Sequence, residues 1–129
     1  NAIIEKGDVL LSSTGDGTLG KCAVYDLNIP AIADSHVTII RVNPNEIDPY
    51  YLCDYLRNGF GSIQIERLYT GSTGMIELTT SQVDSIVIEI KSLKEQKNIS
   101  KEIRKLEKKY LKMLKNAESL LEESRSLLV

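Results

Sequence analysis

The first half of the chain alternates short apolar, β-branched runs with turns rich in glycine and proline. Apolar runs at Val9–Leu11 and Ala23–Tyr25 flank residues 12–21, which hold three glycines and several hydroxyl side chains. The next run, His36–Val42, is rich in β-branched residues and is bounded by Pro44. This pattern predicts a strand, a glycine-rich loop, a second strand and then a third strand.

A helix is predicted to begin at Asp48. Aspartate is a favoured N-cap, and Pro49 suits the first helical position. The apolar residues that follow at helical spacing are Tyr51, Leu52, Tyr55 and Leu56. Gly59 and Gly61 are expected to end this helix, and residues 62–70 leave open a further helix to about Leu68.

The following residues predict three short elements. Met75–Leu78 is expected to be a short strand, Thr80–Val83 a helical turn, and Ile86–Ile90 a strand with high β-propensity.

From about Leu93 the sequence contains no glycine or proline, and apolar positions follow alternating spacings of four and three. Such a heptad repeat is typical of a coiled coil. The positions of the repeat are Ile99, Ile103, Leu106, Tyr110, Met113, Ala117, Leu120, Ser124 and Leu127. At ~1.5 Å per residue the helix is longer than a globular part of this size needs for its own core. We therefore expect it to pair with another helix, and the small or aromatic residues at alternate seam positions favour an antiparallel pair.

Bulk properties limit the classes of protein that the chain can belong to. Its 129 residues fit one modest domain. The start at Asn1 suggests a piece of a longer protein, and no apolar run is long enough for a membrane span, so we expect a cytoplasmic protein. Residues 1–90 carry five bases and twelve acids, a net charge of −7, whereas residues 91–129 carry eleven bases and six acids, a net charge of +5. The change in charge predicts a domain boundary near residue 91.

Two cysteines and one histidine do not form a recognisable metal or catalytic motif. Cys22 and Cys53 have no C-x-x-C spacing, and we expect both to be reduced and buried. His36 lies near Asp34, but no nucleophile motif accompanies it, so a structural, surface or DNA-contacting role is favoured.

The glycines of residues 15–21 formally match nucleotide-binding fingerprints. Gly15, Gly17 and Gly20 have dinucleotide-motif spacing, and Lys21 follows as in a phosphate-binding loop. Those motifs work because a helix begins directly after the glycines, whereas residues 22–26 have a strand pattern. We therefore interpret the loop as a turn that needs positive φ, or as one that approaches a ligand closely.

An ordered set of segments resembles the DNA specificity (S) subunits of bacterial type I restriction enzymes and the related recognition domains fused to adenine-N6 methyltransferases. The segments are Lys6–Leu11, Gly17–Lys21, Pro30–Val37, Ile47–Leu52, Gly71–Ile76, the predicted strand 86–90 and Lys94–Gln96. The resemblance implies an α+β fold. Residues 1–91 would be the C-terminal part of a small β-rich target recognition domain, and residues 92–129 a long coiled-coil helix for dimerisation or spacing.

The resemblance also implies a function. The chain would be a non-catalytic module that recognises double-stranded DNA in a restriction-modification system. It would direct a partner or fused adenine-N6 methyltransferase, with its restriction subunits, to the target site. S-adenosylmethionine would bind in the methyltransferase, since this chain has no motif for it. The alternative is a coiled-coil scaffold whose acidic head binds another protein.

We expect loops 12–21 and 69–74 to face DNA, because both combine glycines with hydroxyl side chains and lie next to a basic residue. The residues expected to contact DNA are Ser13, Thr14, Asp16, Thr18, Lys21, His36, Arg67, Tyr69, Ser72 and Thr73.

Overall fold

The computed structural model describes residues 2–69 and 76–129. Contacts between residues divide the chain into two compact units, residues 1–97 and residues 98–129. The first unit contains all the strands and three helices of the described part, and the second consists of most of one long helix. The predicted α+β class is confirmed.

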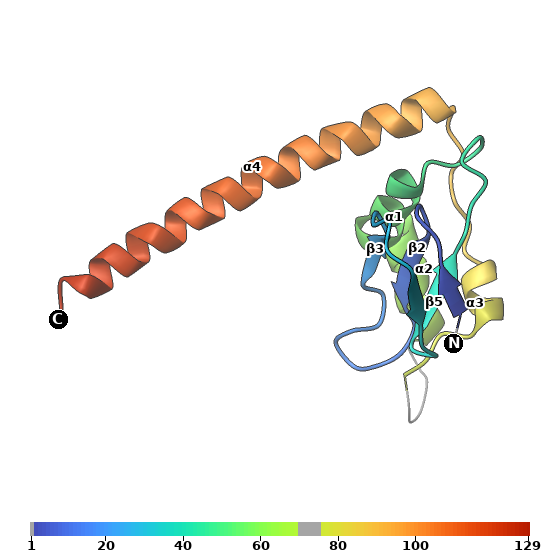
Figure 1. Cartoon of the computed structure of the whole chain (residues 1–129), viewed down its shortest axis with the longest axis horizontal. Coiled ribbons are helices and arrows are strands. Elements are labelled where there is room, and N and C mark those ends of the chain that lie inside the picture. Colours follow the sequence, from blue (N-terminus) through green and yellow to red (C-terminus); the bar gives the residue numbers. More distant parts are fainter. Residues whose placement is uncertain (1, 70–75) are drawn as a thin grey trace. The chain divides into compact units, whose positions relative to one another are not determined.

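Five short antiparallel strands form two small sheets in the first unit (Figure 1). One sheet has β2 (Val9–Ser12) between β3 (Cys22–Val24) and β5 (Val37–Ile40), and the other pairs β1 (Ala2–Ile4) with β4 (Ala31–Ala33). The strands predicted around residues 9–11, 23–25 and 36–42 are confirmed, although the third is shorter. The sequence pattern does not reveal the β1–β4 pair, because each strand has only three residues.

An ion pair between the buried Asp8 carboxylate and the half-exposed Arg41 connects the strands. Asp8, 1% exposed, lies just before β2 and accepts hydrogen bonds from Arg41 Nε (2.8 Å), Arg41 Nη2 (2.7 Å) and the Glu5 backbone N–H (2.7 Å). The Arg41 hydrogen bonds hold the pKa of Asp8 below its usual value, against the opposing effect of burial. Arg41 Nη2 also donates to the Ile3 carbonyl (3.3 Å), so one side chain connects the ends of β1, β2 and β5.

Two consecutive helices pack beside the three-stranded sheet. α1 (Pro49–Asn58) has the predicted cap, since the Asp48 side chain accepts from the Tyr51 N–H at 3.1 Å. The helix ends at Gly59, as expected, and α2 (Phe60–Tyr69) follows directly, so the helix left open over residues 62–70 exists. Gly61 is required at this junction because a Cβ there would lie 2.7 Å from the Tyr55 carbonyl oxygen.

The hydrophobic core lies between the three-stranded sheet and these helices. Val9 and Leu11 of β2 are fully buried, whereas Leu10 and Ser12 are half-buried, as expected for a strand with one face on the core. The other buried core residues are Leu52, Cys53, Leu56, Ile65, Leu78 and Val83. The last of these belongs to α3 (Thr80–Asp84), which confirms the predicted helical turn and has a capping box between Thr79 and Gln82.

The prediction of a strand at Ile86–Ile90 is wrong. Ile86 and Ile88 are half-buried while Val87 and Ile90 are exposed, so the burial resembles that of a strand, but no strand pairs with this segment among the described residues. Helix side chains satisfy its backbone instead. Gln64 accepts from the Val87 N–H (2.8 Å) and donates to the Val87 carbonyl (2.7 Å), and the Tyr51 hydroxyl donates to the Glu89 carbonyl (3.1 Å).

The long C-terminal helix is α4 (Leu93–Ser126), as the sequence predicts. Its first turn belongs to the globular unit and is held there by Gln96, which is completely buried. The Gln96 amide accepts from the Asp48 N–H (2.8 Å) and donates to the carbonyls of Glu46 (3.0 Å) and Lys91 (2.9 Å). One side chain thereby fixes the start of α4 to the start of α1.

Candidate functional site

The loop between β2 and β3 is a tight glycine-dependent turn. Gly15, Gly17 and Gly20 have φ values of 93°, 77° and 89°, which other residues rarely adopt. The Gly20 N–H donates to the Ser12 carbonyl (2.8 Å), and β3 begins immediately after Lys21. A strand rather than a helix therefore follows the glycines, which removes the geometric basis of a nucleotide-binding fingerprint.

This loop pairs with residues that follow the second predicted loop. The Leu78 N–H donates to the Ser13 carbonyl (2.8 Å), the Gly15 N–H donates to the Ile76 carbonyl (3.2 Å), and Thr14 forms a bridge with Glu77. The strand predicted at Met75–Leu78 is thus reduced to a single bridge in its described part, Ile76–Leu78. Met75 lies outside the described residues, as do Ser72 and Thr73.

His36 joins the same loop through its ring and its backbone. Thr14 Oγ1 lies 2.7 Å from His36 Nδ1, and the Ser13 hydroxyl donates to the His36 carbonyl (3.2 Å). Asp16 and Thr18 are exposed in the loop, where the Thr18 hydroxyl donates to the Thr14 carbonyl (2.7 Å). The structure therefore brings five of the residues predicted to contact DNA together in one polar cluster, the hydroxyl loop: Ser13, Thr14, Asp16, Thr18 and His36. Ser13 is buried within this cluster and is not at the surface.

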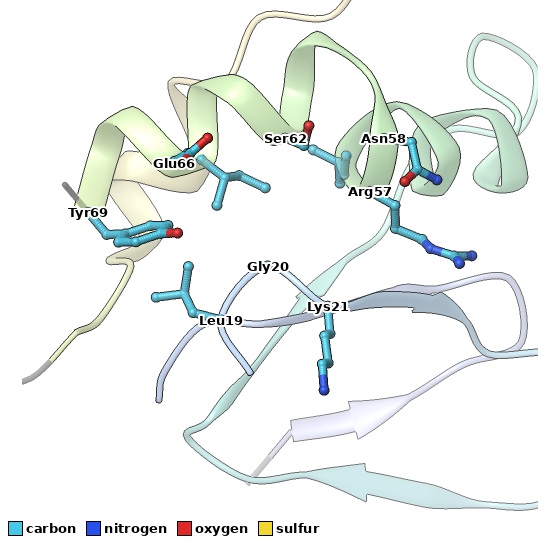
Figure 2. A pocket seen from close by; sticks show the side chains of 10 residues that line it. Leu19, Gly20, Lys21, Arg57, Asn58, Ser62, Glu66 and Tyr69 are labelled. Atoms are coloured by element: carbon cyan, nitrogen blue, oxygen red, sulfur yellow. The ribbon is translucent and has the colours of Figure 1, made fainter. Parts of the chain in front are cut away.

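A cavity of about 320 Å³ opens between the end of this loop and the two helices (Figure 2). Lys21 and Tyr69, both predicted to contact DNA, line it together with four polar residues that the sequence reading missed: Arg57, Asn58, Ser62 and Glu66. Figure 2 shows Tyr69 near Leu19 at one end, with Lys21 and Arg57 at the other. Arg67 is exposed but does not line this cavity.

Helical spacing was the signal that could have identified the missed residues. Ser62, Glu66 and Tyr69 follow at spacings of four and three on α2, which places them on one face. Arg57 and Asn58 occupy the last turn of α1. The sequence pattern left residues 62–70 ambiguous, so this face was not predicted.

Two thiols form a hydrogen-bonded pair between β3 and α1. Cys22 precedes Ala23 in β3, and its thiol donates a hydrogen bond to Cys53 of α1, which together with burial raises the pKa of Cys22. Both cysteines are free, but only Cys53 is fully buried, so the expected burial of Cys22 holds in part. These thiols act as core residues between β3 and α1.

Clusters that would suggest metal chemistry are absent from the described ranges. Within residues 2–69 and 76–129, no group of three or more His, Cys, Asp or Glu side chains could hold a metal ion. None of the described helices combines the length and the hydropathy of a membrane span.

The sequence was compared with models of protein families. The model of the type I restriction modification DNA specificity domain matches residues 1–123, which include the hydroxyl loop, the cavity and most of α4. No curated protein matches the chain.

Proposed function

The chain belongs to the type I restriction-modification DNA specificity family, and from this premise we propose that the hydroxyl loop and the neighbouring cavity contact the target DNA. Sequence-specific DNA recognition is the function of the family. The observation that supports this site is that side chains suited to phosphate contacts lie close to side chains suited to base contacts. Lys21 and Arg57 can neutralise phosphates. Asn58 and the exposed Thr18 hydroxyl can hydrogen-bond base edges.

The module would act without catalysis of its own. It would direct an adenine-N6 methyltransferase, in a partner subunit or a fused domain, and the restriction subunits to the site. S-adenosylmethionine would bind in the methyltransferase. DNA recognition would take place in the cytoplasm. Because residues 1–90 carry a net charge of −7, we propose that the methyltransferase supplies part of the positive potential that DNA binding needs.

Separate substitutions of Lys21 and Arg57, the two basic residues that line the cavity, test the proposed contact with DNA. In the complex of this protein with its methyltransferase subunits, we expect Lys21→Ala and Arg57→Ala each to weaken DNA binding by about tenfold, or about 1.4 kcal/mol. We also expect each to lower the slope of log affinity against log salt by about one, because each substitution removes one phosphate contact. Fluorescence anisotropy at several salt concentrations measures both quantities.

Lys6→Ala is the matched control, because Lys6 is also exposed but lies outside the cavity and the hydroxyl loop. It is expected to leave both the affinity and the salt slope unchanged. Wild-type affinity and slope for both cavity variants would remove this site from the interface and favour the protein-binding scaffold.

We also propose that α4 pairs with a second helix of the same kind, in another copy of the chain or an equivalent segment, in antiparallel orientation. The predicted seam is exposed from Leu106 onward, where Leu106, Met113 and Leu120 are each 60% to 68% exposed. An apolar stripe of this length is typical of an interaction surface. Burial of the stripe against an equivalent helix would remove it from water, and the antiparallel arrangement suits the seam residues Tyr110 and Ala117.

The double variant Leu106→Glu/Leu120→Glu is expected to abolish pairing of the chain with itself while unit 1 stays folded, because two carboxylates would be buried unpaired in the seam. Sedimentation equilibrium measures the association. The control is Lys108→Glu/Lys115→Glu, which changes charges on the side of the helix opposite the seam. It is expected to leave the self-association nearly unchanged. A Leu127→Cys variant that cross-links readily to a second copy would indicate a parallel pair. A monomeric wild-type chain at high concentration would exclude self-pairing.

A further inference from the structure

A second cavity, of about 480 Å³, lies beside β5, which is at the opposite edge of the three-stranded sheet from β3. Its walls are β5, the α1 residues Leu52 and Leu56, and the aliphatic side chains of Val83, Ile86 and Ile88. We call this space the β5 cleft. Its lining is mainly aliphatic, with Thr38, Arg41, Thr80 and Asp84 as the polar residues, so it suits a different ligand from the first cavity.

One wall of the β5 cleft is an open sheet edge. β5 is the last strand of its sheet, since among the described residues it pairs with β2 alone. The Ser13 N–H donates to the His36 carbonyl (3.0 Å), a bond that in an antiparallel ladder lies next to a non-hydrogen-bonded pair, here Ser12 and Val37. Such pairs alternate with hydrogen-bonded pairs, so the backbone groups of Thr38 and Ile40 point to β2.

The backbone groups of Ile39 consequently point away from β2. Its N–H and C=O have no hydrogen-bond partner within residues 2–69 and 76–129. An unpaired donor and acceptor on one residue of an edge strand match the two hydrogen bonds that another strand makes with such a residue. The edge is therefore chemically complementary to an extended polypeptide.

The direction of the side chains agrees with this match. Thr38 and Ile40 lie opposite Leu11 and Val9, both fully buried, so they face the core side of the sheet. Successive residues of a strand added at this edge would point alternately to the two faces. Every second side chain would therefore enter the β5 cleft, and aliphatic side chains fit its lining.

We propose that the β5 cleft binds an extended segment of a partner protein, which adds a strand to β5 through the Ile39 N–H and C=O and places aliphatic side chains at alternate positions in the cleft. The main-chain pairing distinguishes this ligand from a small apolar molecule, which would leave Ile39 unpaired. DNA does not suit the site. The basic residue in the lining of the cleft is Arg41, and its guanidinium is already paired with the Asp8 carboxylate.

The test uses a peptide of about seven residues in which valine and threonine alternate, with a lysine at each end and blocked termini. Nuclear magnetic resonance titration of the whole chain is expected to show saturable shifts of the Ile39 amide and of the Leu52 and Ile86 methyl groups. Hydrogen exchange of the Ile39 amide should slow by at least about tenfold, because it becomes hydrogen-bonded, whereas Thr38 and Ile40 should change little.

Two controls separate strand pairing from other binding. Ile39→Pro removes the outward N–H but none of the β2–β5 bonds and is expected to abolish peptide binding, whereas Ile39→Ala keeps the N–H and should retain it within a few-fold. The same peptide with N-methyl groups on the amides of its valines and threonines should not bind the wild-type chain, a result that does not depend on the folding of the proline variant.

Three results would overturn the proposal. The first is an unprotected Ile39 amide at saturating peptide or at the highest soluble peptide concentration. The second is equal binding of the N-methylated peptide, which would indicate a site for apolar groups alone. The third is a folded Ile39→Pro variant that binds the peptide as tightly as the wild type.

Discussion

Gln96→Leu is expected to lower the free energy of unfolding of the globular unit by about 3–5 kcal/mol. The leucine has a similar volume but leaves the Asp48 N–H and the carbonyls of Glu46 and Lys91 without the partner that Gln96 provides. Each buried polar group left unpaired costs about 1–3 kcal/mol. The Gln96 side chain is completely buried, so water cannot readily replace the hydrogen bonds that are lost.

Urea unfolding followed by circular dichroism measures this effect as a fall in the midpoint with little change in the slope. Lys97→Leu is the matched control, because Lys97 is the next residue of the same helix but is exposed, and the expected change is within about 0.5 kcal/mol. Equal stability of the two variants would show that Gln96 does not hold the start of α4 in place.

Asp8→Ala is expected to destabilise the same unit by about 3 kcal/mol. Removal of the buried carboxylate leaves the Arg41 guanidinium and the Glu5 N–H without their shared acceptor. Loss of one partner of a buried ion pair costs about 3–5 kcal/mol, and we expect the lower end because half of the Arg41 side chain is exposed and can be rehydrated.

Glu5→Ala provides the control for this prediction. The Glu5 carboxylate also lies near Arg41 (3.3 Å), but it is 64% exposed, so its loss should change the free energy of unfolding by less than about 1 kcal/mol. Both variants are compared with the wild type by urea unfolding at neutral pH. Similar losses for Asp8→Ala and Glu5→Ala would contradict the role assigned to burial.

The Asp8 contribution should also depend on pH. Because the pKa of Asp8 is lower in the folded chain, the ionised form stabilises the fold above the ordinary aspartate pKa of about 3.9. That stabilisation is lost as the pH falls through the lowered folded pKa. The difference in unfolding free energy between wild type and Asp8→Asn should therefore shrink below about pH 4. A constant difference across this range would show that the charge of Asp8 is not involved.

Local patterns were sufficient for elements whose signals lie within a few residues. The cap at Asp48 with Pro49, the glycine turn before β3, the helical turn at Thr80 and the long heptad helix follow from neighbouring residue types alone. The same signals predicted the hydroxyl loop, because glycines and hydroxyls are adjacent in sequence. Such features depend on backbone preferences and short-range hydrogen bonds, which a single sequence displays directly.

The cavity of the candidate site required the tertiary structure. Lys21 of the loop is far in sequence from Arg57 and Asn58 of α1 and from Ser62 and Glu66 of α2, and only the packing of both helices beside the sheet gathers them around one space. The polar face of α2 was not predicted because the start of this helix was ambiguous in the sequence. Gly59 and Gly61 usually indicate the end of a helix, whereas here they form a close junction between two helices.

The sequence of this protein by itself determined its class, most of its strands and helices, the polar loop and the resemblance to DNA specificity subunits, because these depend on local preferences and on an ordered set of short segments. The tertiary structure decided that Ile86–Ile90 does not pair with a strand. Its burial resembles that of a strand, but its backbone is hydrogen-bonded by the side chains of Gln64 and Tyr51. Whether a β-prone segment joins a sheet depends on which backbone or side-chain partners the fold brings within hydrogen-bond distance, and propensity carries no information about those partners.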